Sequence, residues 1–317
     1  MNLRKLLKMI YRVYVSFKKG ILDPESEAIK MTIKNMGIKS IKNLSKGKYF
    51  DIEITKSKKE LDEIEKISGN LLSNPVIENF RIIKKWLVHK KIVSIIIFPG
   101  SNCDRDLKIA IENHMNVKVD YIWHNDREIR DCEMIFIPGG FSFGDYLRSG
   151  ALATKSKAIE EVIRLSKKGI PIIGICNGFQ ILTECGLLDG TLLNNHNQLF
   201  ICKESFLKVE NNNSIFTRNL KKIVQFPIAH AQGNFFTSND NLKRLEDNQQ
   251  IIFKYCSSKG KIDKKNNPNG SLNNIAGICN KEKNILGMMP HPERAINLFE
   301  SHDGILFFNS LKEILWH

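Results

Sequence analysis

The segment that most constrains the fold of this chain is Gly174-Ile175-Cys176-Asn177-Gly178, which follows the apolar run Ile172–Ile175 and precedes a helical pattern. It is the cysteine version of the G-x-S-x-G nucleophile elbow, in which a strand turns sharply into a helix. The flanking glycines permit a strained turn, and the helix N-terminus directs N–H groups and a positive dipole end toward the thiol. We therefore predict an α/β sheet with a reactive Cys176 at a strand end, against the alternative of an inert buried cysteine.

The region around this elbow has the pattern of a doubly wound α/β domain. Near-continuous apolar runs at Ile92–Phe98, Met134–Ile137 and Ile172–Ile175 predict buried parallel strands, and Ala153–Lys168 predicts a helix between two of them. Strands that alternate with helices place the chemistry at the carboxyl ends of the strands. Because 317 residues suggest roughly two domains, we assign residues 91–317 to this one.

A smaller module is expected over residues 1–88. Period-2 alternation predicts a strand over Tyr11–Phe17, and Asp23-Pro24-Glu25 is typical of a helix start, with Gly37 ending the helix. Such a module buries little surface for its size, so we expect it to self-associate or to dock on another surface. The order is βαββαβ, the ferredoxin-like plan, with these further elements: strands over Ile38–Leu44 and Tyr49–Ile54, a helix over Lys58–Leu72, an extended segment over Val76–Ile83, and then a linker, Trp86–Lys91.

Composition argues against several classes of protein. The net charge of +14 comes from scattered lysines without a long arginine-rich block, which favours a basic, solvated surface over a nucleic-acid or membrane partner. The seven cysteines include no Cys-x-x-Cys pair, so we expect reduced thiols and no metal site. No apolar run approaches the roughly 18 residues of a membrane span, and the N-terminal segment fails as a signal peptide. A cytoplasmic protein is therefore expected.

A thiol nucleophile needs a base and a residue that orients the base. Both are present in Met289-Pro290-His291-Pro292-Glu293-Arg294. We predict a triad of Cys176 as nucleophile, His291 as base and Glu293 as its partner, with the prolines fixing both side chains toward one site. Taken alone, the segment could also be a surface loop. Cys103 is the second candidate thiol, but it lacks elbow glycines, and we predict that it lines the site.

The oxyanion of a tetrahedral intermediate needs two converging N–H donors. One expected donor is the backbone amide of Asn177, directly after the nucleophile. The other is expected from Gly139-Gly140-Phe141, where glycines at a strand end allow close backbone approach, so that Gly140 and Phe141 are the candidates. A simple tight turn is the alternative for this segment.

Six motifs of the chain can be compared with known families. Four of them are Gly174–Gln180, Phe98–Asp104, Pro138–Arg148 and Met289–Arg294, and the other two are Gly20–Glu25 and Leu72–Glu78. The first four together resemble the glutaminase subunit of phosphoribosylformylglycinamidine synthase, a class I glutamine amidotransferase, over about Lys91–Trp316. The other two make residues 10–85 resemble the small accessory subunit of the same enzyme. Two subunits that are normally encoded apart thus look fused in this chain.

The resemblance implies the roles given above for the triad and places Gln180 among the residues that contact glutamine. Gly139 and His230 are further substrate-binding candidates. The family usually has His-Gly-Glu-Gly where this chain has His230-Ala231-Gln232-Gly233, so a carboxylate is lost in this loop.

The resemblance further implies that glutamine is hydrolysed to glutamate and ammonia through a thioester on Cys176. Ammonia would pass to a separate large synthetase subunit that uses ATP and magnesium to convert formylglycinamide ribonucleotide to the amidine in purine biosynthesis. This chain has no G-x-x-x-x-G-K-[ST] phosphate loop, and we expect it to carry no cofactor of its own.

Two other functions compete. A stand-alone cysteine hydrolase or thiol chaperone of related fold would share the elbow, but it would need neither the His-Pro-Glu segment nor the N-terminal module. A basic ferredoxin-like RNA-binding protein is the rival from another class, because Lys46–Glu53 is similar to an aromatic RNP1 strand. The acids Asp51 and Glu53 in that strand would repel phosphate, which disfavours RNA binding.

Overall fold

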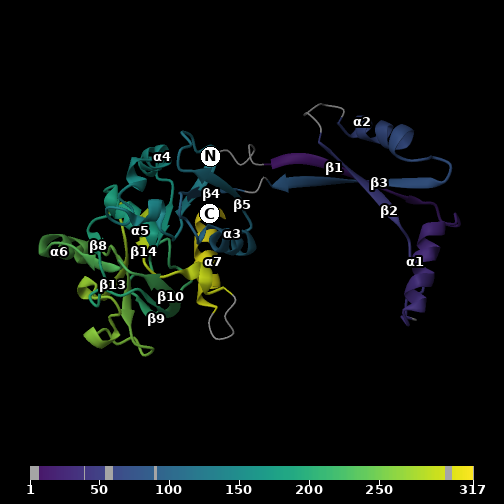
Figure 1. The fold of residues 1–317 in the computed structure, drawn as a ribbon. Helices are drawn as coiled ribbons and strands as arrows, with labels where there is room; N and C mark the ends of the chain where they lie inside the picture. Colours follow the sequence, from purple (N-terminus) through teal and green to yellow (C-terminus); the bar gives the residue numbers. More distant parts are fainter. Residues whose placement is uncertain (1–6, 39, 54–59, 89–90, 297–301, 317) are drawn as a thin grey trace. The chain divides into compact units, whose positions relative to one another are not determined.

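The computed structural model describes residues 7–38, 40–53, 60–88, 91–296 and 302–316. The chain divides into two compact units, Met1–His89 and Lys90–His317 (Figure 1). Among the described residues, no helix combines the length and the apolar character needed to cross a membrane.

The first unit, as far as it is described, is a three-stranded antiparallel sheet of order β2-β1-β3 with two helices. Tyr11, Val13 and Val15 alternate along β1 and so point to one face, where they pack with Ile64 of α2. Asp23 caps α1 by accepting a hydrogen bond from the Glu25 amide. The elements are β1 (Leu7–Phe17), α1 (Pro24–Asn35), β2 (Gly47–Glu53), α2 (Glu60–Ile67) with a π-helical turn at Ser68–Leu72, and β3 (Glu78–Val88).

The fourth strand predicted over Ile38–Leu44 is not formed. Residue 39 lies outside the described residues, and the others adopt neither helix nor strand. Because β1 already has a partner on each side, a fourth strand could pair only at a free edge of the sheet. Ile38, Ile41 and Leu44 recur every three residues, so no face of such a strand would be uniformly apolar. The ferredoxin-like plan is otherwise confirmed, and β3 continues through Trp86–Val88, which were predicted as linker.

The second unit is built on a mixed sheet that has nine strands over its described residues, in the order β10-β9-β12-β13-β14-β7-β6-β4-β5. The strands from β14 to β5 are parallel, and the remaining four extend the sheet in antiparallel fashion. A separate pair joins β8 (Thr191–Leu193) to β11 (Asn234–Phe236). The large sheet contains β4 (Ile92–Ile97), β5 (Lys118–Trp123), β6 (Cys132–Ile137), β7 (Ile172–Ile175), β9 (Ile201–Val209), β10 (Ile223–His230), β12 (Ile251–Cys256), β13 (Ile275–Cys279) and β14 (Ile285–Met288).

Helices cover both faces of this sheet. The ring of Phe136 in β6 lies 6.4 Å from that of Phe308 in α7, whereas its neighbour Ile137 lies against Gly178 of α5. Successive residues of a strand point to opposite faces, so α5 and α7 lie on opposite sides and the predicted doubly wound fold is confirmed. The helices are α3 (Asp104–Met115), α4 (Lys157–Ser166), α5 (Asn177–Glu184), α6 (Asn239–Asp247) and α7 (Asp303–Trp316).

The contact between Gly178 and β6 gives a test of how closely α5 must pack. A Cβ atom added at Gly178 would lie 2.0 Å from the carbonyl oxygen of Ile137, so α5 or β6 must move to admit it. We expect Gly178→Ala to lower the free energy of unfolding by about 1–3 kcal/mol, as overpacking commonly does. Thermal unfolding measures this. Gly69→Ala is the control, because its Cβ would meet only the Phe80 ring, at 3.7 Å; equal stability of Gly178→Ala and the unchanged chain would contradict the prediction.

Candidate active site

Cys176 lies between β7 and α5, in a backbone conformation that non-glycine residues rarely adopt. Its φ of 52° and ψ of −106° are strained, so the strain lies in the cysteine itself. The two flanking glycines provide space instead: a Cβ on Gly174 would lie 2.6 Å from the carbonyl oxygen of Gly178. The Cys176 amide donates to the carbonyl of Met288 at 2.7 Å, and its own carbonyl accepts from the first turn of α5. This geometry is that of a nucleophile elbow.

His291 and Glu293 form a buried pair just beyond the end of β14. Nδ1 of His291 lies 2.7 Å from Oε1 of Glu293, and each residue is only 2% exposed. The His291 amide donates to the carbonyl of Pro227 in β10 at 2.8 Å, which fixes the segment against the sheet. Within the described part of the chain, Nε2 of His291 and Oε2 of Glu293 have no hydrogen-bond partner. Nδ1 is thus held by a carboxylate, whereas Nε2 is available for proton transfer.

The imidazole of His291 interacts electrostatically with the thiol of Cys176. Burial by itself disfavours the imidazolium, but the Glu293 carboxylate and the thiols of Cys176 and Cys103 more than offset it and hold the pKa of His291 well above its usual value. A positive imidazole beside a thiol is the arrangement in which cysteine serves as a nucleophile. The structure therefore brings together the three residues of the predicted triad.

Cys103 also lies beside this imidazole. It precedes α3, and its Sγ accepts a hydrogen bond from Nη2 of Arg294 at 3.2 Å. Burial raises the pKa of the Cys103 thiol, although His291 and Arg294 act in the opposite direction. The sequence predicted that Cys103 lines the site, from its position at the end of another strand of the same sheet. It did not predict that Cys103 would share the imidazole with Cys176.

The two predicted sources of oxyanion donors lie at the ends of β6 and β7. Asn177 is the first residue of α5, so its amide is an N-terminal donor of that helix. The Phe141 amide already donates to the carbonyl of Gly100 at 2.9 Å. Gly140, at a φ of 150°, packs so closely on Gly100 and Ser101 that a Cβ there would lie 2.7 Å from the Gly100 oxygen. Of the two candidates in this loop, Gly140 thus remains as our choice.

The Asn177 side chain ties the elbow to the loop that follows β6. Its Nδ2 donates to Oε1 of Gln180 at 2.9 Å and to Oδ1 of Asp145 at 3.3 Å, and its Oδ1 accepts from the Ser142 amide at 3.1 Å. Gln180 in turn donates to the carbonyl of Gln232 at 2.6 Å. Gln180 is buried and links α5 to the loop at Gln232, so both ends of its amide already have partners within the protein.

His230 lies at the end of β10 and is fixed by two buried amides. Its Nδ1 lies 3.1 Å from Oδ1 of Asn195 and its Nε2 lies 3.5 Å from Nδ2 of Asn269. Burial and the nearby His291 lower the pKa of His230 to about 4, so it is neutral near pH 7. A Cβ on Gly233 would lie 2.3 Å from the His230 ring, which explains glycine there.

Gly139 is a point of close approach between the strand end and the triad. A Cβ there would lie 2.7 Å from Cε1 of His291 and 3.0 Å from Sγ of Cys103. Sequence reasoning missed Asn195 and Asn269, which are held in loops and have no motif around them. It also left open the lost carboxylate at Gln232, whose Oε1 accepts a 3.4 Å hydrogen bond from the Ser149 amide.

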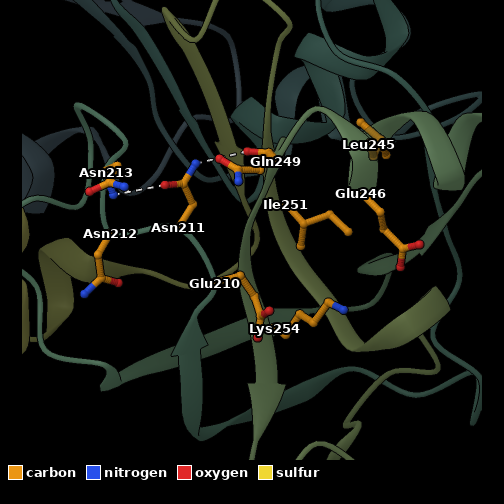
Figure 2. A pocket seen from close by; sticks show the side chains of 9 residues that line it. All are labelled: Glu210, Asn211, Asn212, Asn213, Leu245, Glu246, Gln249, Ile251 and Lys254. Atoms are coloured by element: carbon orange, nitrogen blue, oxygen red, sulfur yellow. Dashed lines mark hydrogen bonds between the residues drawn. The ribbon is translucent and has the colours of Figure 1, made fainter.

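Two of the cavities in the second unit differ in their relation to this site. One, of about 560 Å³, is bordered by Gln232 and by the loops at residues 147–148 and 192–198. The other, of about 410 Å³, lies between α6, β12 and the loop at residues 210–213, and Figure 2 shows amide and carboxylate side chains around it. The second cavity contains none of the predicted site residues, and we assign it no chemistry.

The fold and the site geometry place a strained cysteine and a buried histidine–glutamate pair at the strand ends of a mixed α/β sheet. The family model of the CobB/CobQ-like glutamine amidotransferase domain matches residues 90–303. A second model, PurS, described as phosphoribosylformylglycinamidine (FGAM) synthase, matches residues 10–85.

Comparison with individual proteins identifies the family more closely. The phosphoribosylformylglycinamidine synthase subunit PurQ of Pelagibacter ubique is 49% identical over 220 residues, which are 69% of this chain and 96% of that protein. The subunit of the same name from Aquifex aeolicus is 46% identical over 221 residues, which are 69% of this chain and 97% of that protein. A chain in the structure of PurLQS from Thermotoga maritima is 39% identical with a TM-score of 0.63 and covers 71% of this chain and 99% of that one. This chain therefore belongs to the PurQ family of glutamine amidotransferases, with a PurS-type module ahead of the PurQ segment, which confirms the predicted fusion.

The His291–Glu293 contact predicts unequal effects of two substitutions. His291→Ala removes the proton acceptor and should lower kcat by about 10²–10⁴-fold. Glu293→Gln keeps the shape but removes the charge that opposes the effect of burial, so it should lower the pKa of His291 and reduce kcat less. The rate of glutamate release and an NMR titration of the imidazole measure these effects. Unchanged rates in both variants would mean that the pair is structural.

Proposed function

We propose that this chain hydrolyses L-glutamine to glutamate and ammonia through a thioester on Cys176. The observation that carries the proposal is the interaction of Cys176, in the strained conformation of the elbow, with the imidazole of the buried His291–Glu293 pair. Membership of the PurQ family supports the same reaction and the same enzyme, the glutaminase component of phosphoribosylformylglycinamidine synthase in purine biosynthesis.

The geometry suggests the following steps. The Cys176 thiolate attacks the side-chain amide carbon of glutamine, and the oxyanion is stabilised by the Asn177 amide and, in our proposal, by that of Gly140. His291 donates a proton from Nε2 to the leaving ammonia, while Glu293 holds Nδ1 and so fixes the ring. Water then attacks the thioester with His291 accepting its proton, which releases glutamate and restores the thiol.

Ammonia formed here would be used on another chain. We expect a large synthetase subunit to bind ATP and magnesium and to convert formylglycinamide ribonucleotide to the amidine, with no cofactor held by this chain. The similar chain from Thermotoga maritima belongs to the structure of PurLQS, which supports an assembly of this kind here. A purine-biosynthesis role also suggests a cytoplasmic location.

The N-terminal unit is proposed to act by assembly. Residues 1–88 contain neither cysteine nor histidine, the usual nucleophile and base near neutral pH. Helix α1 buries only Ser26 among its residues and leaves Met31 65% exposed. Unburied apolar side chains on a small module favour docking or self-association.

The competing functions fit these observations less well. A stand-alone hydrolase or thiol chaperone leaves both the PurS-type module and the buried base unexplained. If this sheet bound RNA, unpaired positive side chains would have to lie near the aromatic Tyr49 to attract the phosphates. Its neighbour Arg12 is instead paired with Asp51, with N–O distances of 2.6 and 2.5 Å, which removes much of the attraction for phosphate.

Cys176→Ser tests the nucleophile. A serine hydroxyl is a far weaker nucleophile than a thiolate at this position, so glutamine-dependent synthesis by the assembled enzyme should fall by at least about 10³-fold. Ammonia-dependent synthesis should persist, because that step belongs to the other subunit, and it serves as the control for intact assembly. Full glutamine use by the serine variant would refute the assignment and direct attention to Cys103.

Deletion of residues 1–88 tests the assembly role. The PurQ relative from Pelagibacter ubique consists almost entirely of the matched segment, with 96% of its length covered, so the remaining unit should fold. When two binding surfaces lie on one chain and one of them has bound, the effective concentration of the other surface is raised to about the millimolar range. We therefore expect weaker binding to the synthetase and less coupling of glutamine hydrolysis to synthesis, measured by sedimentation and by the ratio of product to glutamate. Unchanged affinity and coupling would contradict this role.

A further inference from the structure

The loop that follows β6 is held in a strained conformation beside the elbow. Phe143, Asp145 and Leu147 have φ values of 54°, 54° and 69°, in the left-handed region that residues other than glycine rarely adopt. The hydroxyl of Ser142 is buried and has no hydrogen-bond partner among the residues that the structure describes. Strain and an unpaired polar atom of this kind persist where the surrounding structure imposes them, often at functional sites. The loop therefore depends on its neighbours for its conformation.

Hydrogen bonds hold this loop from two sides. On the side of β4, the Phe143 amide donates to the carbonyl of Pro99 at 2.7 Å. On the side of the elbow, Oδ1 of Asn177 accepts from the Ser142 amide at 3.1 Å, and Nδ2 of Asn177 donates to Oδ1 of Asp145 at 3.3 Å. The Asn177 side chain is buried in the first turn of α5. One buried side chain thus joins two positions of the strained loop to the helix that begins at the nucleophile.

The carboxamide of Asn177 suits this position because it both accepts and donates. The second proton of Nδ2 is donated to Oε1 of Gln180 at 2.9 Å, so the oxygen and both N–H groups have partners. An ionised aspartate has the same shape and can accept from Ser142, but it can donate to neither Asp145 nor Gln180. It would also bring two carboxylates within hydrogen-bond distance of each other, where like charges repel. The position therefore distinguishes an amide from a carboxylate of equal shape.

We propose that Asn177 is a positioning residue that aligns the two oxyanion donors, through the contacts of its side chain with Ser142 and Asp145. This role rests on the proposed function, in which the backbone amides of Asn177 and Gly140 bind one oxygen. Gly140 precedes Ser142 by two residues, so a loop released from the Asn177 side chain moves the Gly140 amide away from that of Asn177. Such donors act on the transition state and hence on kcat, and a displacement of about 1 Å can lower a rate by about 10²-fold.

Asn177→Asp and its rescue by Asp145→Asn test this role in the full-length chain. Asn177→Asp should lower kcat for glutamate release by about 10–100-fold, because a repulsion replaces the contact with the loop. Adding Asp145→Asn supplies an amide that can donate to the introduced carboxylate, and it should raise kcat again by at least about fivefold. Asp145→Asn alone keeps an acceptor oxygen and should lower kcat by less than about threefold. Gln180 lacks its donor with and without the rescue, so the recovery of kcat reports the loop contact.

Two reagents for the same thiol separate positioning from a general loss of structure. An aldehyde analogue of glutamine takes up the Cys176 thiolate at its carbonyl carbon and leaves an oxygen at the oxyanion position, whereas iodoacetamide alkylates the thiolate without forming an oxyanion. Asn177→Asp should weaken binding of the aldehyde by about 10–100-fold, in parallel with kcat. The rate of Cys176 alkylation, measured by mass spectrometry, should change by less than about threefold, because that reaction needs no oxyanion donor.

Asn211→Asp is the matched control. Asn211 is a buried asparagine whose Nδ2 donates to the carbonyl of Gln249 at 3.1 Å and whose Oδ1 accepts from the Asn213 amide at 3.0 Å, in the cavity of Figure 2. The same substitution there removes the same kind of hydrogen bond away from the candidate site. It should leave kcat and the affinity for the aldehyde unchanged.

The proposal is overturned if Asn177→Asp keeps its full kcat, if Asp145→Asn gives no rescue, or if Cys176 alkylation slows as much as aldehyde binding weakens. If thermal unfolding shows that Asn177→Asp does not fold, Asp145→Ala removes the same loop contact and should lower kcat by at least about threefold; an unchanged kcat would then overturn the proposal. An unsubstituted chain that neither releases glutamate nor binds the aldehyde would refute the proposed function, and the positioning role with it. Glutamine hydrolysis that is insensitive to Asn177→Asp would refute the positioning role alone.

Discussion

The pairing of β14 with β7 is the constraint on which the site depends. In this parallel pair Met288 lies opposite Ile175, and the carbonyl of Met288 accepts the hydrogen bond from the strained Cys176. Three residues after Met288 the chain reaches His291. One strand pairing thus fixes the backbone of the nucleophile and the starting point of the base. Parallel strands end at the same edge of a sheet, which is why residues more than one hundred positions apart meet there.

The neighbourhood of each histidine decides its chemistry. His291 and His230 are both buried, and burial disfavours the charged form of each. Glu293 reverses that effect for His291, whereas His230 has the neutral amides of Asn195 and Asn269 as hydrogen-bond partners and the nearby His291 lowers its pKa further, so it stays uncharged. The first ring can therefore carry a proton in the proposed reaction, and the second stays neutral in its contacts with Asn195 and Asn269.

The two units differ in the residue types that they contain, and this difference is visible in the sequence. All cysteines and histidines of the chain lie from His89 onward, and the PurQ-type unit carries the whole candidate site. The PurS-type unit has a core of few residues around Tyr11, Val13, Val15 and Ile64. A strand predicted beside this core did not form, because apolar residues spaced by three cannot make one apolar face. The local sequence pattern thus predicted a strand correctly where one face of the strand is buried, and it predicted a strand wrongly where no face is buried.

The sequence by itself determined the strand–elbow–helix order and the family, and it supplied the candidates for the triad. These depend on short-range chemistry: β-branched runs, glycines that admit close packing, and prolines around His291. Only the tertiary structure decided that Phe141 donates its N–H to Gly100 in the loop after β4, that Asn195 and Asn269 fix His230, and that Cys103 lies beside the imidazole. Each of these contacts joins segments distant in the chain. Such contacts follow from how the strands are ordered in the sheet, and no local spacing encodes that order.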